Sequence, residues 1–328
     1  MRNYHQLNPI IRLKEMTLLK PQEVEQMITA KNFAVVETVL QQTHYQRYLN
    51  PYFHEQFEIS LDEELLKTIK ELIELVPNQE ILRLYMMPFT FHNLKVLTKE
   101  SVTGKDYAHL LVEDGFYTID ECRTAIKTGV SEVLPEKIVT TIQEVREYLE
   151  GGAVLQGIDI IYDRRYLHEQ RRLADKINIP ELQEAVIKMI DLTNITIAAR
   201  CLSQKRSCSF MKAVLVSVGS IPKEEFLAFA DASYSDFITF LLESEYQEVM
   251  RPIIHEQVID FAGLALLQDN LITESFASAQ IDALGPLPLL AFLNAKILEL
   301  QNLRILLVGK RSGFTEGQIR ERMRRYDA

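Results

Sequence analysis

The histidine and cysteine residues are the first places to look for metal or nucleophilic chemistry in this sequence. His168-Glu169 begins like the H-E-x-x-H zinc motif, but Arg172 stands where the second histidine ligand would be. Cys201 and Cys208 lie seven positions apart, wider than the C-x₂₋₄-C spacing of zinc sites. No other histidine has a second histidine or cysteine three or four residues further on. We therefore expect no metal site and no catalytic residue of these types.

The stretch most similar to a phosphate-binding loop is Gly309-Lys310-Arg311-Ser312-Gly313. It lacks the G-x-x-x-x-G-K-[ST] pattern, and the residues before it have the periodicity of a helix rather than a strand. We expect Gly309 to end that helix, with the two cations complementing its negative end. The sequence also has no G-x-S-x-G motif. These observations predict no cofactor and no catalytic site.

The composition favours an all-α protein. Of 328 residues, 47% are hydrophobic and 25% are charged, while only 12 are Gly and 11 are Pro. So few turn-forming residues are unusual for an all-β protein, and long segments carry apolar residues at helical spacing. The net charge of −10 argues against a general nucleic-acid binder and against binding to an anionic membrane by charge alone.

The sequence shows no sign of a signal peptide or of a membrane-spanning helix. The start Met1-Arg-Asn-Tyr-His has no apolar segment of the kind found in signal peptides. No run reaches the roughly 18 apolar residues of a membrane-spanning helix. We expect a cytoplasmic chain, or one peripheral on a complex, with its three cysteines reduced.

The longest periodic segment covers residues 286–308. Its apolar residues recur at steps of three and four, which is the spacing of one buried helical face: Leu289, Leu293, Ile297, Leu300, Leu303 and Leu307. A helix of this length is expected to pass through the middle of a domain. Thr315 and Gln318 then form a T-x-x-Q capping box, which predicts a second, short helix.

Three other local signals place helix starts. Ser60 with Glu63 forms a capping-box pattern, from which we expect a helix beginning at residue 60 and running to Val76. Thr118 with Glu121 predicts another start. Pro252 suits a first helical position, so a helix is expected over 252–268, ending before Asp269-Asn270.

An internal repeat is suggested by three asparagines, Asn93, Asn194 and Asn302, which are 101 and 108 residues apart. An aliphatic residue follows each asparagine, and each segment leads to a glycine and then to a capped helix start. The alternative is chance, because many helix–turn–helix segments share these signals. If the repeat is real, three related helical units are expected at 1–115, 116–220 and 221–328. Three such units placed pseudo-symmetrically around an axis would form a ring or funnel.

Two segments of this acidic chain are locally basic, and one of them is a candidate partner interface. Residues 309–325 carry six cations. The other segment is a predicted helix over about 153–176, whose arginines are the better interface candidates: Arg164, Arg165, Arg171 and Arg172. The alternative is a solvated helix face, which is the usual meaning of such charge.

The carboxyl-terminal region resembles a known family. Residues 288–310 (PLLAFLNAKILELQNLRILLVGK) and 319–322 (IRER) resemble the end of the C subunit of the bacterial and archaeal V/A-type rotary ATPases, known as the d subunit in eukaryotes. The amino-terminal residues that resemble the start of that family are Tyr4, Asn8, Ile11, Arg12, Leu18, Leu19, Tyr45, Tyr48 and Leu49. Pro9 and the acid-poor amino terminus differ from the expected pattern.

The resemblance implies a non-catalytic subunit of the central rotor. Such a subunit is a helical funnel of three similar domains on the cytoplasmic face of the membrane rotor ring, and a coiled-coil subunit of the central stalk inserts into it. It passes torque from the stalk to the ring, which moves H⁺ or Na⁺, and it is a monomer within the hetero-oligomeric complex. Two other hypotheses remain open: a helical-repeat adaptor of another cytosolic complex, and an all-α enzyme with an unrecognised site.

Overall fold

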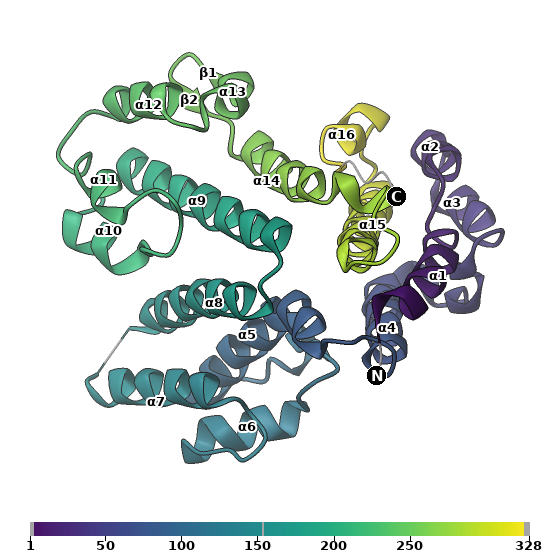
Figure 1. Ribbon diagram of the computed structural model, residues 1–328, viewed down its shortest axis with the longest axis horizontal. Helices are drawn as coiled ribbons and strands as arrows, with labels where there is room; N and C mark the ends of the chain where they lie inside the picture. The colour runs from purple at the N-terminus through teal and green to yellow at the C-terminus, as the bar shows by residue number, and fades with distance from the viewer. Residues whose placement is uncertain (1–2, 153, 325–328) are drawn as a thin grey trace. The chain divides into compact units, whose positions relative to one another are not determined.

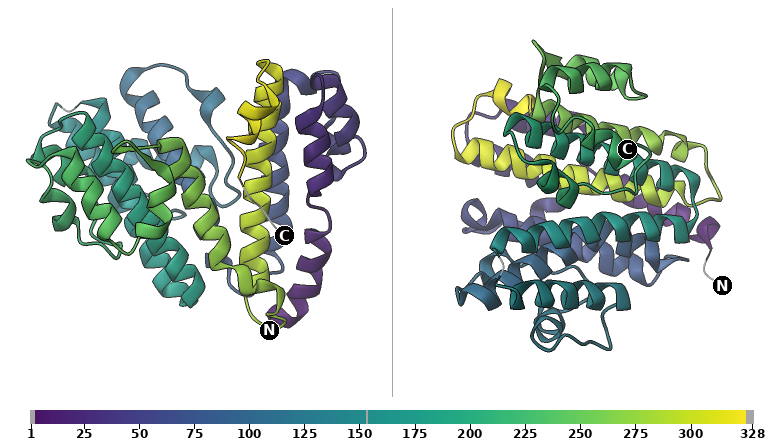
Figure 2. Two further views of the ribbon diagram at one scale, coloured as in Figure 1. Left: turned by 90° about the horizontal axis from the view of Figure 1, so that it is seen from above. Right: turned by 90° about the vertical axis from the view of Figure 1, so that its left-hand side faces the viewer.

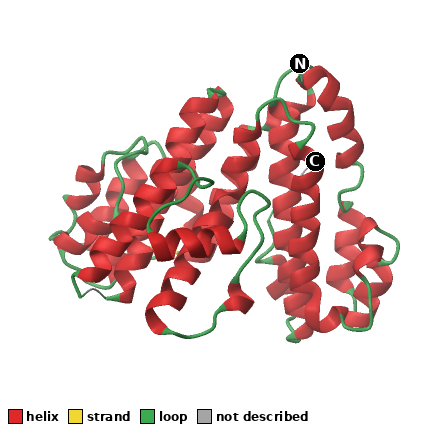
Figure 3. Ribbon diagram, turned by 90° about the horizontal axis from the view of Figure 1, so that it is seen from below, coloured by secondary structure: helices red, strands yellow, loops and turns green. Residues whose placement is uncertain are grey.

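Helices joined by loops make up nearly all of the computed structural model, which describes residues 3–152 and 154–324 (Figure 3). The prediction of an all-α protein is therefore confirmed. The described strands are a two-residue pair, β1 (Ile254–His255) and β2 (Val258–Ile259), which form an antiparallel hairpin. The chain divides into two compact units, of which unit 1 comprises Met1–Gln79 with Ala265–Ala328 and unit 2 comprises Glu80–Leu264.

Each unit has its own set of helices, labelled in Figure 1. Unit 1 contains α1 (Tyr4–Glu15), α2 (Pro21–Thr29), α3 (Phe33–Leu40), η1 (His44–Tyr48), α4 (Phe53–Ile73), η4 (Ala277–Gln280), α15 (Leu287–Arg311) and α16 (Glu316–Arg320). Unit 2 contains α5 (Gln79–Thr103), η2 (Ala108–Leu110), α6 (Ile119–Thr128), α7 (Glu136–Glu150), α8 (Leu155–Ile177), α9 (Pro180–Ser203), α10 (Cys208–Val214), α11 (Lys223–Leu227), α12 (Tyr234–Glu243), α13 (Gln247–Met250) and η3 (Arg251–Ile253). The boundary between the units falls within α14 (Phe261–Ser275).

Unit 1 is built around α15. This helix packs against α1, α3, α4, α16 and η4, and its neighbours run alongside it in Figure 2. Of its 25 residues, 17 are buried, so the helix is enclosed on nearly every side. The expectation that this helix passes through the middle of a domain is confirmed. The apolar stripe explains why, since leucines that are spaced three and four apart must be covered by other helices.

Unit 2 is organised around α8 and α9. Helix α8 packs between α7 and α9, and α6 adds to the outer side of α7 (Figure 1). The shorter helices α10, α11 and α12 cover α9. A cluster of phenylalanine rings joins α11 to α12: Phe226 of α11 and Phe237 and Phe240 of α12 have ring centroids 6.3–6.4 Å apart. These contacts hold the short helices in place, because helices of five to ten residues are marginal by themselves.

Two predicted helix starts are wrong. Helix α4 begins at Phe53, so Ser60 lies inside it and is only 8% exposed. The buried rings of Phe53 and Phe57 extend the apolar stripe toward the amino terminus, and this packing overrides the local capping signal. Pro252 lies in a 3₁₀ turn that leads into the β-hairpin, and α14 begins only at Phe261 and continues through 269–270 to Ser275.

The predicted end of the long helix is also corrected. Helix α15 continues past Gly309 to Arg311, and the left-handed residue is Gly313, with φ of +74°. The N–H of Phe314 donates to the carbonyl of Gly309 at 2.8 Å, and the N–H of Gly313 donates to that of Lys310. This is the Schellman arrangement. Gly309 is required for another reason: a Cβ there would lie 2.9 Å from Cγ1 of Ile319 on α16.

Candidate functional site

The three asparagines singled out in the sequence make the same kind of contact. In each case the side-chain amide donates to one backbone carbonyl, and the side-chain oxygen accepts from the N–H of the same residue. The donor and acceptor distances are 2.5 and 3.0 Å for Asn93 with Val112, 2.9 and 3.2 Å for Asn194 with Val216, and 2.9 and 2.8 Å for Asn302 with Arg324. We call these three contacts the asparagine ties. Because all three asparagines are at most 2% exposed, the ties satisfy backbone groups away from bulk water.

The asparagine ties occupy equivalent places in three helices of nearly equal length. Helices α5, α9 and α15 have 25, 24 and 25 residues, and each carries its asparagine in the second half. The tied residue follows η2 in the first case, α10 in the second and α16 in the third. In an alignment of the three segments based on the ties, α16 therefore corresponds to η2 and α10. The sequence pattern gave a different alignment, in which the start of α16 corresponds to the starts of α6 and α11. It did so because a capping box marks any helix start.

A buried polar residue lies three positions before each asparagine, on the same side of its helix. In α5, the hydroxyl of Thr90 donates to the carboxylate of Asp114 at 2.5 Å. In α9, Asp191 is fully buried and accepts from the N–H of Ser220 at 2.9 Å and from the phenol of Tyr246 at 2.8 Å. Burial raises the pKa of Asp114, although its hydrogen bonds oppose that shift. These contacts fix the loops that follow η2 and α10.

In α15 the corresponding residue is Glu299, which belongs to a buried ionic cluster that the sequence analysis missed. The ammonium of Lys296 lies 2.8 Å from Glu299 and 2.9 Å from Glu64 on α4, and these three side chains are at most 4% exposed. The phenol of Tyr45 donates to Glu299 at 2.6 Å, and the N–H of Leu19 donates to its other oxygen. The cluster therefore joins α15 to α4, to η1 and to the segment before α2.

All four carboxylate oxygens of this cluster are engaged. Glu64 accepts at one oxygen from Lys296 and His44, and at the other from Arg47 and Tyr48, each at 2.8 Å. Burial alone would raise the pKa of Glu64. The hydrogen bond from His44 and the adjacent charge of Lys296 outweigh burial and hold that pKa well below its usual range. A carboxylate so fully bonded is suited to a structural role rather than to proton transfer.

A signal for this cluster was present in the sequence. Lys296 and Glu299 are three positions apart in a helix that is otherwise apolar on nearly every side. An i, i+3 pair of opposite charge within an enclosed helix predicts a buried pair. The distant partners gave no such signal, since Tyr45 is 254 residues from Glu299.

The four candidate interface arginines lie in two adjacent rows on α8. Arg165 pairs with Glu144 at 2.6 Å, Arg171 with Asp175 at 2.9 Å and Arg172 with Glu169 at 2.8 Å. Arg171 also donates to the carbonyl of Val218 at 3.0 Å. These three side chains remain 30–47% exposed. The fourth, Arg164, has a buried Nε without a hydrogen-bond partner among the described residues.

Arg172 lies on the edge of a cavity of about 420 Å³ in unit 2. Apolar side chains, including Phe91, Ile138 and Leu173, line this cavity together with charged side chains of both signs: Glu80, Arg83, Glu132, Glu169, Arg172 and Lys176. Of the four candidate arginines, Arg172 is the one among the residues that line this cavity, and its role at an interface stays a prediction.

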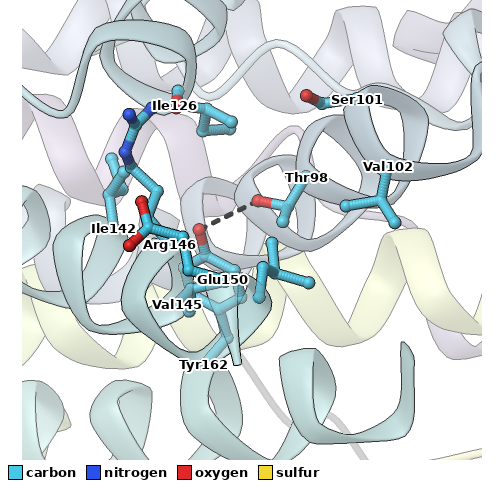
Figure 4. Close-up of a pocket in the computed structure, with 10 residues that line it drawn as sticks. Thr98, Ser101, Val102, Ile126, Ile142, Val145, Arg146, Glu150 and Tyr162 are labelled. Atoms are coloured by element: carbon cyan, nitrogen blue, oxygen red, sulfur yellow. Dashed lines mark hydrogen bonds between the residues drawn. The ribbon is translucent and has the colours of Figure 1, made fainter. Parts of the chain in front are cut away.

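A smaller cavity of about 200 Å³ lies between α5, α6, α7 and α8 (Figure 4). The hydroxyls of Thr98 and Tyr162 are hydrogen-bonded at 3.0 Å, and Arg146 donates to the carbonyl of Ile126 at 2.7 Å. Burial raises the pKa of the Tyr162 phenol. Three polar side chains of this cavity thus bond to one another or to the backbone: Thr98, Arg146 and Tyr162. Nothing in their geometry resembles a nucleophile beside a base.

The described residues include neither a metal-binding cluster nor a membrane-spanning helix. Over 3–152 and 154–324, no group of three or more histidine, cysteine, aspartate or glutamate side chains could hold a metal ion. Within the same ranges, no helix is both long enough and apolar enough to cross a membrane.

These features define an all-helical protein in which buried polar side chains tie long helices to distant segments. The sequence model of the family described as ATP synthase (C/AC39) subunit matches residues 7–322. The C subunit of the V-type sodium ATPase of Enterococcus hirae is 46% identical over 325 residues, which are 99% of this chain and 99% of that protein. The chain belongs to the ATP synthase (C/AC39) subunit family, so the resemblance noted in the sequence is confirmed. This membership supports a V/A-type ATPase subunit over an unrelated helical-repeat adaptor.

Proposed function

We propose that this chain is a non-catalytic subunit of the central rotor of a V/A-type ATPase. In this role it sits on the cytoplasmic face of the membrane, links the central stalk to the membrane rotor ring and transmits torque between them. The observation that carries the proposal is the 46% identity, over 99% of both chains, to the C subunit of a V-type ATPase. The ion that the complex moves, H⁺ or Na⁺, is selected in the ring rather than by this chain.

The internal contacts of each unit suit a part that carries load. Side-chain bonds that join the middle of a long helix to a distant segment resist sliding and rotation of that helix. In unit 1, α15 is held by the Lys296 cluster and by the tie of Asn302. In unit 2, α5 and α9 are held by the ties of Asn93 and Asn194. A buried polar network that is fully bonded has this stiffening effect.

The equivalent asparagine ties support three related helical units. Under this proposal each of the three predicted units, which differ from the two compact units described above, has one matching long helix: α5, α9 or α15. Each tie closes a segment of about 20 residues after its asparagine. The boundaries 1–115, 116–220 and 221–328, and the placing of the units around a funnel that receives the stalk, remain predictions. The asparagines themselves act within the fold rather than on a partner, because they are buried.

The arginine rows on α8 are the proposed contact with an acidic partner surface. Arg165, Arg171 and Arg172 are now paired with carboxylates on α7 and α8, and these ion pairs are partly exposed. Because exposed ion pairs contribute little to stability, replacing these carboxylates by those of a binding partner costs little free energy. The cavity that Arg172 lines, with its mixed apolar and charged lining, would receive a side chain of the same partner. Contact to the stalk or the ring is expected through this face.

Binding to purified partners tests the proposed function. The purified chain should bind both the stalk subunits and the detergent-solubilised rotor ring of the same complex, measured separately by pull-down and by biolayer interferometry. Assembled complexes that lack the chain should fail to couple ATP hydrolysis to ion movement. If the chain binds neither partner, the adaptor hypothesis is favoured.

A charge reversal tests the arginine rows. Arg171→Glu combined with Arg172→Glu should weaken binding to the stalk or the ring while leaving the circular dichroism and thermal unfolding of the chain intact. The matched control is Lys105→Glu with Arg123→Glu, which reverses two charges elsewhere in unit 2. Equal binding by the two double variants and the wild type would remove α8 as the contact.

A further inference from the structure

Two cations of unit 2 are partly covered and have no acidic partner. They are Arg164 on α8 and Lys223, the first residue of α11. Within residues 3–152 and 154–324, neither forms an ion pair, and the buried Nε of Arg164 makes no hydrogen bond. Covering a charge without a counter-ion costs free energy. These two cations are therefore suited to bind an anionic group from outside the chain.

One face of α8 brings the two cations together. Arg164, His168 and Arg171 follow one another at steps of four and three, so they share that face. The guanidinium of Arg171 donates to the carbonyl of Val218 at 3.0 Å, which holds the loop before α11 against α8. Lys223 comes five residues after Val218. We call Arg164, His168, Arg171 and Lys223 the cationic patch.

The imidazole of His168 reports the charge of the cationic patch. Burial lowers the pKa of His168 below its ordinary value, and the charges of Arg164, Arg165 and Lys223 lower that pKa further. The carboxylate of Glu169 opposes the shift but does not reverse it. Because Lys223 acts on this imidazole together with the arginines of α8, the two helices contribute to one region of positive potential.

The acidic residues beside the cationic patch leave its two unpaired cations free of a counter-ion. Asp175 and Glu169 are each bound to an arginine of α8, at 2.9 and 2.8 Å. Glu224 and Glu225 are exposed in the same helix as Lys223, and neither pairs with it. The carboxylate that would complete the patch must therefore come from another molecule.

The sign of this charge distinguishes the two partners of the proposed function. Cytoplasmic loops of membrane proteins carry an excess of lysine and arginine, so a membrane rotor ring would present the same charge as the patch. A coiled coil instead carries glutamates beside its apolar seam. The planar guanidinium of an arginine matches a carboxylate, which it can bind through two parallel hydrogen bonds. The charge of the patch thus favours the stalk.

We propose that the cationic patch binds carboxylates of the central-stalk coiled coil. Arg164 binds a glutamate or aspartate side chain of the stalk, and Lys223 contributes a second cation from α11. The inference rests on the proposed function and sharpens it. It assigns this face of α8 to the stalk rather than to the ring, and it adds a lysine of α11 to the arginine rows.

Neutral variants of the two unpaired cations test this assignment. Arg164→Gln with Lys223→Gln should weaken binding to purified stalk subunits by roughly tenfold, since charge-assisted bonds in a partly covered site are lost. Binding to the detergent-solubilised ring should be unchanged. In biolayer interferometry the loss should be larger at low salt than at high salt. Each single variant is measured as well, so that the patch is still tested if the double variant unfolds at a lower temperature.

The matched control is Lys127→Gln with Lys137→Gln. These lysines of unit 2 are exposed and, within the described parts of the chain, form no ion pair. The control makes the same change in net charge as the test variant, and it should bind the stalk like the wild type.

The outcomes separate this inference from the proposed function. If the wild type binds neither the stalk nor the ring, the proposed function fails and the patch fails with it. If the wild type binds the stalk and the test variant binds it equally well, or the control loses as much affinity, only the patch is refuted. Loss of ring binding with stalk binding retained would also refute it. Wild-type binding to vesicles of phosphatidylglycerol and phosphatidylcholine that the test variant loses would refute it too, because the patch would then bind lipid.

Discussion

Replacing Lys296 by Met should destabilise unit 1 far more than the loss of a surface ion pair does. The ammonium of Lys296 is 2.9 Å from Glu64 and 2.8 Å from Glu299, and all three side chains are at most 4% exposed. Met has nearly the same length, so packing is retained while two buried carboxylates lose their shared cation. Removing one partner of a buried ion pair costs about 3–5 kcal/mol. We expect a loss of that size in the free energy of unfolding at pH 7.

The control is Lys14→Met, which removes a partly exposed pair with Glu71 and should cost less than about 1 kcal/mol. Both variants are compared with the wild type by urea unfolding followed by circular dichroism, at pH 7 and pH 5. A loss in Lys296→Met no larger than in Lys14→Met would refute the reasoning, because the carboxylates would then not depend on this cation.

The pH dependence provides a second check on the same variant. In the wild type the folded pKa of Glu64 is lowered, so its stabilisation is constant between pH 7 and 5 and is lost only below the unfolded pKa of about 4.3. Without Lys296 the folded pKa of Glu64 rises from its wild-type position, because one of the groups that oppose the effect of burial is gone. The variant then takes up this proton at a higher pH than the wild type does, and this uptake favours its folded state as the pH falls. The deficit of Lys296→Met relative to the wild type should therefore shrink from pH 7 to pH 5.

Three further measurements test other contacts. Asn194→Ala should lower the free energy of unfolding by about 2–4 kcal/mol, since a backbone N–H and carbonyl both lose a buried partner; a loss below about 1 kcal/mol would mean that water replaces the tie. Gly309→Val should cost about 1–3 kcal/mol in thermal unfolding, because its side chain collides with Ile319 on α16. Iodoacetamide at pH 8 should label native protein once, at the exposed Cys208. Burial raises the pKa of Cys122 to about 12, and mass spectrometry should find the two buried thiols labelled only after unfolding.

The long helices were predictable from the sequence because their signals are repeated over many residues. The periodic leucines of 286–308 indicated α15, and the capping boxes at Thr118 and Thr315 begin α6 and α16 as expected. At Ser60 the same local pattern failed, since packing of the preceding residues extended the helix. The hairpin before α14 was missed because its strands have only two residues each, too few for periodicity to detect.

The candidate site was predictable only where one helix carries the signal. The asparagines and the α8 arginines were identified from their own segments. Besides Lys296, Glu299 accepts hydrogen bonds from Leu19 and Tyr45. No pattern within one segment indicates contacts between residues so far apart in the chain. The exposure of Ile281 was missed for a related reason, since it depends on the absence of covering neighbours in the folded unit, which periodicity does not reveal.

The asparagine ties have a consequence for how the chain exchanges its amide protons with deuterium. The N–H groups of Val112, Val216 and Arg324 each donate to a side chain rather than to a helix or strand partner. These protons can exchange only when the tie opens, so each reports the local opening of its own segment. The chain therefore contains three matched probes. Their relative exchange rates would rank how firmly α5, α9 and α15 are anchored, first in the free chain and then in the assembled complex.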